Sequence, residues 1–262
     1  MNAAQALAYH QRHKPEALLA VARGKTVLEQ YDGGFSEDTA HALYSGTKSF
    51  WGVTALTAQA EGLIELDEPA WNGATMRQLL NLTAGVPFGG LGSAVPAYEK
   101  ALATLPNDAP GKRFTYSGIP LQIFGALFAQ RLRPLGMTPH AYLQERIVKP
   151  AKFDIAKWRV LKDGTSPLPT GAFLTARNWA RYGAYVLKNR ERFAQCFTGS
   201  DANPRYGLGW WLAPKGAPAG TFYASGSGGQ AMYVVPSEEL VVVRFGAGGS
   251  YNHEAFLKRL TG

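Results

Sequence analysis

The stretch YSGTKSFWG, residues 44–52, places Ser45 three residues before Lys48 at the start of an apolar segment. In a helix, positions i and i+3 lie on one face a turn apart, so the serine hydroxyl and the lysine amine can come within hydrogen-bonding distance. A nucleophile and its general base need that geometry. The alternative is that Ser45 caps the helix while Lys48 extends into solvent.

The segment that follows, SFWGVTALTAQAEGLIEL (49–66), is apolar around most of a helical circumference, which predicts a buried helix. Lys48 then enters an interior where desolvation and the positive end of the helix dipole both favour loss of its proton. A neutral Lys48 could accept the proton of Ser45. The Ser-x-x-Lys spacing alone is weak evidence, because chance gives roughly half a match in a chain of this composition.

Runs of β-type sequence lie near both ends of the chain. ALLAVA (17–22) and TVLEQY (26–31) flank a short turn, and AMYVV (231–235) and LVVVRF (240–245) repeat the arrangement. We therefore expect an α/β (α+β) fold, in which one antiparallel sheet is built from the N- and C-terminal strands and flanked by helices.

The middle of the chain is predicted to form a helical, loop-rich lobe. Its candidate helices are 75–82, 120–132, 138–148 and 175–189. No internal repeat or low-complexity linker divides the sequence. We expect a single catalytic unit, with a sheet lobe at about 1–66 and 200–262 and a helical lobe at about 67–199.

The chain has 262 residues, 46% of them apolar, and a formal charge of +8. This apolar content excludes a disordered chain. The charge could engage nucleic-acid phosphates, but the basic residues form only short clusters, RLR (131–133) and KNRER (188–192), without a nucleic-acid-binding motif. A small-molecule substrate is expected, and no nucleic-acid partner.

No metal or cofactor is predicted. Cys196 is the single cysteine, and no Cys/His pair has metal-ligand spacing. The histidines are interpreted as surface or packing residues: His10, His13, His41, His140 and His253.

The sequence has no apolar span and no signal-peptide pattern, which predicts a soluble, cytoplasmic protein without a membrane partner. Removal of a leader from a periplasmic or secreted protein would leave the same sequence.

Several stretches, in this order, carry a resemblance to a known family. They are YSGTKSFWG with GLIELDEPA (62–70) and MRQLLNLTAGV (76–86), then PGKRFTYSG (110–118), LPTGAFLTARNWARYG (168–183), NPRYGLGWWL (203–212) and FYASGSGGQAMYVVP (222–236). Together they resemble the serine β-lactamase and penicillin-binding-protein superfamily. The resemblance covers nearly the whole chain and is strongest to the class C-like branch with family VIII carboxylesterases and aminohexanoate-dimer hydrolases. It implies a β-lactamase/transpeptidase-like fold.

The resemblance also implies roles for particular residues. Ser45 would form an acyl-enzyme, and Lys48 and Tyr116 would share the proton transfers. The backbone N–H groups of Ser45 and Ser227 would form the oxyanion hole, beside Ser225 and Gly226. The alternatives are a packed core tyrosine at 116 and an ordinary turn at SGSGG (225–229).

Two positions depart from the family pattern. Gly118 stands where the Tyr-x-Asn element has asparagine in the substrate-binding region, and Ala224 stands where lysine or histidine is common. A substrate carboxylate would lose a partner, whereas a neutral ester or amide would not. Trp210 and Trp211 are candidates for a pocket wall, although core packing is the simpler interpretation.

These observations predict a serine acyl hydrolase of small esters or amides, with weak or no β-lactamase activity. A β-lactamase or DD-peptidase is one alternative. A catalytically silent binding or sensor protein on the same fold is another, because a fold does not guarantee activity.

Overall fold

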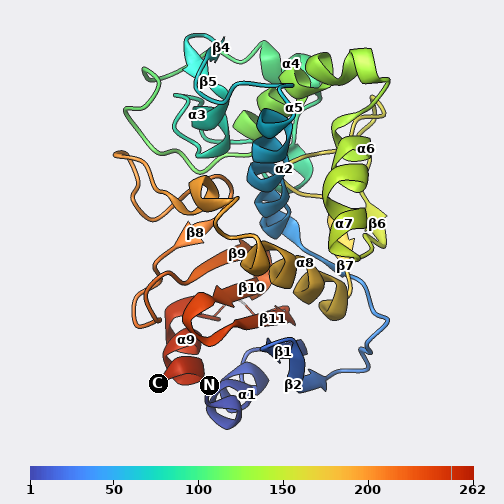
Figure 1. Cartoon of the computed structure of the whole chain (residues 1–262), viewed down its shortest axis with the longest axis vertical. Helices are drawn as coiled ribbons and strands as arrows, with labels where there is room; N and C mark the ends of the chain where they lie inside the picture. Colours follow the sequence, from blue (N-terminus) through green and yellow to red (C-terminus); the bar gives the residue numbers. More distant parts are fainter. Residues whose placement is uncertain (249) are drawn as a thin grey trace.

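The computed structural model describes residues 1–248 and 250–262, and it confirms the predicted sheet built from both ends of the chain. Six antiparallel strands follow the order β2-β1-β11-β10-β9-β8 (Figure 1). Their bounds are β1 (Pro15–Ala22), β2 (Lys25–Tyr31), β8 (Trp211–Leu212), β9 (Phe222–Gly226), β10 (Gln230–Val235) and β11 (Leu240–Gly246). The two termini meet where β1 pairs with β11, from Ala17 opposite Phe245 to Ala22 opposite Leu240.

The helices and the shorter strands complete the chain. The helices are α1 (Ala3–Gln11), α2 (Ser49–Ala60), α3 (Met76–Leu80), α4 (Tyr98–Leu102), α5 (Ile119–Leu132), α6 (Pro139–Leu143), α7 (Lys149–Ala151), α8 (Ala176–Lys188) and α9 (His253–Thr261). The short strands are β3 (His41–Ala42), β4 (Pro69–Trp71), β5 (Ala74–Thr75), β6 (Lys157–Trp158) and β7 (Ala172–Leu174).

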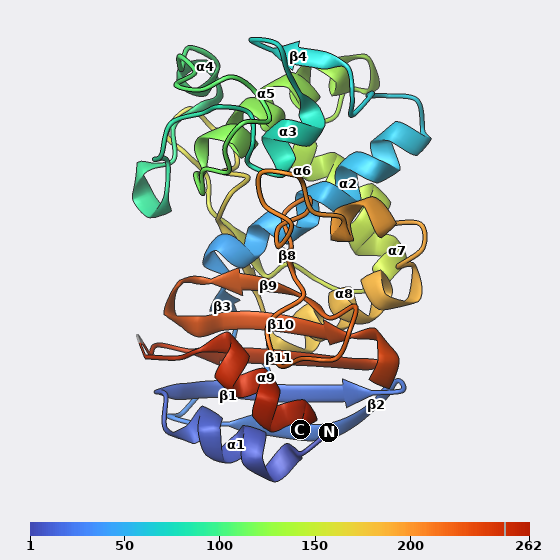
Figure 2. The same cartoon turned by 90° about the vertical axis from the view of Figure 1, so that its left-hand side faces the viewer.

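Helices cover both faces of the large sheet. Because side chains alternate along a strand, Leu18 and Ala20 of β1 pack toward α1 and α9, whereas Ala17 and Leu19 pack on the opposite side with α8. Figure 2 shows α9 in front of the sheet and α8 behind it. Every residue of β10 and β11 is buried as a result. The range of α8 falls within the predicted helical lobe, yet this helix packs on the sheet.

The remaining helices form a lobe around α2 at one edge of the sheet (Figures 1 and 2). Helix α2 is buried at ten of its twelve residues, as its sequence predicts. It ends at Ala60 and not at residue 66, because Gly62 adopts a left-handed conformation with φ of +72°, which closes the helix. The predicted helix 138–148 contains α6 followed by a wider π-type turn at 144–148.

Candidate active site

Ser45 lies in a single 3₁₀ turn, η1 (Tyr44–Lys48), that leads directly into α2. Neither η1 nor α2 receives a capping hydrogen bond from a side chain, which contradicts the alternative that Ser45 serves as a helix cap. Tyr44 has φ of +47°, a conformation that a non-glycine residue rarely adopts. Backbone strain of this kind gathers at functional sites, here in the residue before the candidate nucleophile.

Lys48 is oriented toward Ser45 inside the protein. Its Nζ lies 2.8 Å from Ser45 Oγ and 3.2 Å from the carbonyl oxygen of Pro169, and only 1% of the residue is exposed. Burial lowers the pKa of Lys48 from 10.5 to about 7. A neutral amine can donate a hydrogen bond to Pro169 while accepting one from the Ser45 hydroxyl. The pair therefore has the distance that a nucleophile and its base require, and burial brings the pKa of the amine close to neutral pH.

Tyr116 lies beside this pair. The Lys48 Nζ is 4.9 Å from the centre of the Tyr116 ring, which stacks on Trp211 at 5.6 Å between centroids. Burial raises the pKa of Tyr116, and a hydrogen bond with Ser45 partly opposes the shift. The phenol therefore keeps its proton at neutral pH and can donate it.

Strand β9 reaches the Ser45 turn because residue 226 has no side chain. A β-carbon on Gly226 would lie 2.1 Å from the carbonyl oxygen of Leu43, so only glycine permits this approach. The strand ends there, and Ser227 begins the turn η6 (Ser227–Gly229). Ser225, Gly226 and Ser227 consequently lie along the same cavity as Ser45.

This cavity has a volume of about 590 Å³. Its lining comprises Tyr44, Ser45, Lys48, Gly90, Leu91, Gly92, Tyr116, Pro169, Thr170, Trp211, Tyr223, Ser225, Gly226, Ser227 and His253. The structure thus brings together six of the seven candidate site residues named from the sequence. Of the two tryptophans, Trp211 lies in the wall of the cavity and Trp210 is buried in the core.

Gly118 is the candidate that does not line the cavity. It precedes α5, where its N–H donates to the carbonyl oxygen of Gly89 at 2.9 Å. A β-carbon at position 118 would lie 1.9 Å from the carbonyl oxygen of Gly90. The loop containing Gly90 thus occupies the space that an asparagine side chain would need.

Sequence reasoning missed His253, which was interpreted as a surface or packing residue. It is the first residue of α9 and lines the cavity, with Nε2 3.0 Å from Ser225 Oγ. Burial and the positive charge of Arg244 lower the pKa of His253 to about 4, so the ring is neutral at pH 7. The amphipathic pattern HEAFLKRL (253–260) predicted the helix but gave no sign of its position over β9.

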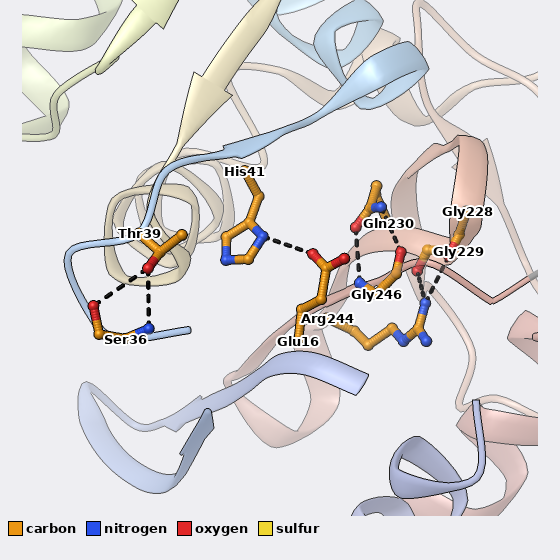
Figure 3. Close-up of polar contacts among 9 residues, drawn as sticks. All are labelled: Glu16, Ser36, Thr39, His41, Gly228, Gly229, Gln230, Arg244 and Gly246. Carbon is orange, nitrogen blue, oxygen red and sulfur yellow. Dashed lines mark hydrogen bonds and ion pairs between the residues drawn. The ribbon is translucent and has the colours of Figure 1, made fainter. Parts of the chain in front are cut away.

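A buried arginine supports the turn that carries Ser227. The Nη1 atom of Arg244 donates to the carbonyl oxygens of Gly228 at 3.0 Å and Gly229 at 2.8 Å (Figure 3). A β-carbon on Gly229 would lie 2.4 Å from that nitrogen, so glycine leaves room for the guanidinium. Arg244 thereby fixes the backbone immediately after Ser227.

Figure 3 also draws contacts of Gln230 and of His41. Gln230 bonds both backbone groups of Gly246, through Nε2 to the carbonyl at 2.6 Å and Oε1 to the N–H at 3.1 Å. His41 Nδ1 lies 2.8 Å from a Glu16 carboxylate oxygen, outside the lining of the cavity. The Gln230 contact ties the start of β10 to the end of β11.

Within residues 1–248 and 250–262, no group of three or more His, Cys, Asp or Glu side chains is arranged to hold a metal ion. None of the helices in these ranges is long and apolar enough to cross a membrane.

A sequence model of the beta-lactamase family matches residues 3–259. A comparison with curated protein sequences gives no match.

Solved structures share the fold at low sequence identity. A protein from Bacillus anthracis, provisionally named a 6-aminohexanoate-dimer hydrolase, is 22% identical with a TM-score of 0.74, over 93% of this chain and 76% of that one. A D-stereospecific amidohydrolase from Streptomyces sp. is 18% identical with a TM-score of 0.73, over 98% of both chains. EstCE1, described as a hydrolase with promiscuous acyltransferase activity, is 15% identical with a TM-score of 0.76, over 97% and 96%.

Proposed function

The chain belongs to the beta-lactamase family, and on that premise we propose that it is a serine acyl hydrolase acting on small neutral esters or amides through an acyl-enzyme at Ser45. The observation that carries the proposal is the 2.8 Å contact between Ser45 Oγ and the buried Nζ of Lys48, whose pKa burial lowers to about 7. A structural lysine would more readily extend to solvent or pair with a carboxylate.

In the proposed reaction, Ser45 Oγ attacks the substrate carbonyl carbon while its proton passes to Lys48 Nζ. The carbonyl oxygen becomes an oxyanion, which the backbone N–H groups of Ser45 and Ser227 stabilise. As the bond to the leaving group breaks, Tyr116 gives its phenol proton to that group and regains one from Lys48. The net result is an acyl-enzyme and a protonated leaving group.

Deacylation runs through the same groups. A water molecule attacks the acyl carbon, and its proton passes to Lys48. The bond between the acyl carbon and Ser45 Oγ breaks, and Lys48 passes the proton on to the serine oxygen, which frees the acid and restores the resting enzyme.

The lining of the cavity supports a neutral substrate. Among the described residues that line the cavity, only Lys48 and His253 have side chains that can carry a positive charge. Burial lowers the pKa of both. A carboxylate entering the cavity would lose its hydration without gaining a full positive charge. We therefore propose weak or no β-lactamase activity, because β-lactam substrates carry such a group.

The test compares wild type with Ser45→Ala in hydrolysis of p-nitrophenyl butyrate, with nitrocefin assayed beside it. We expect ester turnover that disappears in Ser45→Ala, and much slower turnover of nitrocefin. Efficient nitrocefin hydrolysis would favour a β-lactamase instead. Labelling of Ser45 without turnover of either compound would favour a binding or sensor protein.

A further inference from the structure

His253 is held in one orientation within the cavity wall. Its Nε2 lies 3.0 Å from Ser225 Oγ, and its Nδ1 lies 2.7 Å from Tyr233 Oη. Rotation of the ring would break both contacts. The Tyr223 ring, 5.1 Å away between centroids, packs against it as well. Both ring nitrogens therefore have a partner, as a buried imidazole requires, and these partners fix the side of the ring that faces Ser225.

The contacts continue behind His253 into the protein. Tyr233 Oη is 2.8 Å from Tyr251 Oη, and the Arg244 guanidinium lies 4.1 Å from the centre of the Tyr251 ring. Burial, and to a lesser extent the charge of Arg244, lower the pKa of His253 and keep the imidazole neutral at pH 7. A neutral ring has one donor and one acceptor, so it can satisfy one bond of the Ser225 hydroxyl and leave the others for the cavity.

We infer that Ser225 and His253 form a recognition site for an uncharged hydrogen-bonding group of the substrate, of the carboxamide type, and that His253 is a specificity-determining residue acting through Ser225. The inference rests on the proposed hydrolase function and narrows its substrate class. Ser225 supplies the contact, and His253 fixes the direction of its hydroxyl. A carboxylate is disfavoured at the same place because neither residue supplies a positive charge.

Two matched sets of esters test this on either side of the scissile bond. The acyl-side set is the p-nitrophenyl esters of hexanoic acid, 6-amino-6-oxohexanoic acid and adipic acid as its half-ester, which end in methyl, carboxamide and carboxylate. The leaving-group set is the butyrates of 4-methylphenol, 4-hydroxybenzamide and 4-hydroxybenzoic acid. The measured quantity is the carboxamide-to-methyl ratio of kcat/KM, compared between variants so that intrinsic reactivity cancels.

The variants are His253→Leu, Ser225→Ala, the double variant, and His253→Gln, which keeps a neutral polar group. Lys258→Ala is the control, since Lys258 is an exposed residue of the same helix. In one of the two ester sets, we expect His253→Leu and Ser225→Ala each to lower the carboxamide-to-methyl ratio of kcat/KM roughly five-fold. A change of this size corresponds to the loss of one neutral hydrogen bond. The double variant should fall no further, because the two residues act as one unit, and His253→Gln should retain part of the ratio.

In the ester set whose carboxamide-to-methyl ratio falls in the variants, the carboxylate ester should be the one that the wild type hydrolyses most slowly. An unchanged ratio in both sets for Ser225→Ala, or a carboxylate ester as fast as its carboxamide partner, overturns the inference. Ser225→Ala alone suffices for that test if His253→Leu does not fold. Ester turnover that persists in Ser45→Ala would instead overturn the proposed function, so the two failures are distinguishable.

Discussion

The carbonyl oxygen of Gly90 occupies the space that a β-carbon on Gly118 would need, since the two atoms would be 1.9 Å apart. The loop containing Gly90 therefore leaves no room for a side chain at position 118, where the family pattern has asparagine. We expect Gly118→Asn to lower the free energy of unfolding by about 3 kcal/mol, because a backbone oxygen cannot give way cheaply.

Urea denaturation measures this effect, and Gly136→Asn is the control. Gly136 also lies in a loop, has open space around it, and has φ of +64°, which asparagine tolerates. The Gly118→Asn variant should also gain no nitrocefin hydrolysis. A Gly118→Asn protein as stable as the wild type would show that the loop yields easily.

The buried Lys48 should reduce stability. Its pKa is lower in the folded protein than the 10.5 of the unfolded chain, so between about pH 7 and 10.5 the unfolded state binds more protons and stability rises with pH. We expect Lys48→Met to be more stable than wild type by roughly 2 kcal/mol at pH 6. The difference should shrink as the pH approaches 10.

Urea denaturation of both proteins at pH 6, 8 and 10 measures this difference. Lys258→Met, which replaces an exposed lysine, should show no such trend. A constant difference across the pH range would mean that Lys48 is not deprotonated by burial.

The pH dependence of hydrolysis should follow the same group. Below about pH 7, Lys48 carries its proton and cannot accept another, so kcat/KM for p-nitrophenyl butyrate should rise with pH through an apparent pKa near 7. Tyr116 has a raised pKa, so the rising limb should not depend on its ionisation. Tyr116→Phe should lower the rate while leaving the midpoint near 7. If the apparent pKa of the rising part of the profile shifted away from 7 in Tyr116→Phe, the titrating group would be the tyrosine and not Lys48.

Removal of the Arg244 support should act on kcat more than on KM. Arg244→Met leaves the Gly228 and Gly229 carbonyl oxygens without their donor and loosens the turn that carries Ser227. Because an oxyanion hole acts in the transition state, we expect about a ten-fold loss in kcat. Arg259→Met is the control, since Arg259 is exposed and its guanidinium contacts the Tyr9 ring and the carbonyl oxygen of Ala255, with no hydrogen bond to the turn among the described residues. A loss confined to KM would contradict this role.

The local part of the site could be predicted from the sequence. Ser45 and Lys48 are one helical turn apart, so any helical start at that point brings them together. The hairpins were predicted because their alternating apolar runs flank turn residues. The end of α2 was misplaced, although Gly62 carried the signal for it.

The distant part of the site could not be predicted in this way. His253 and Ser225 are 28 residues apart, and their contact depends on where α9 packs across the sheet. The approach of Gly90 to Gly118 depends on the path of a loop that has no periodic pattern. Tertiary packing decides both contacts. In the sequence, the glycine at position 118 is the one local sign of such a close approach.

Labelling with a fluorophosphonate tests the central claim most directly, since this reagent forms a stable bond with an activated serine. Peptide mass spectrometry of the wild type should place one label on Ser45, and labelling should be lost in Ser45→Ala and strongly slowed in Lys48→Met. A label on Ser225 or Ser227, or no label on a folded wild type, would contradict the assignment of Ser45 as the nucleophile and Lys48 as its base.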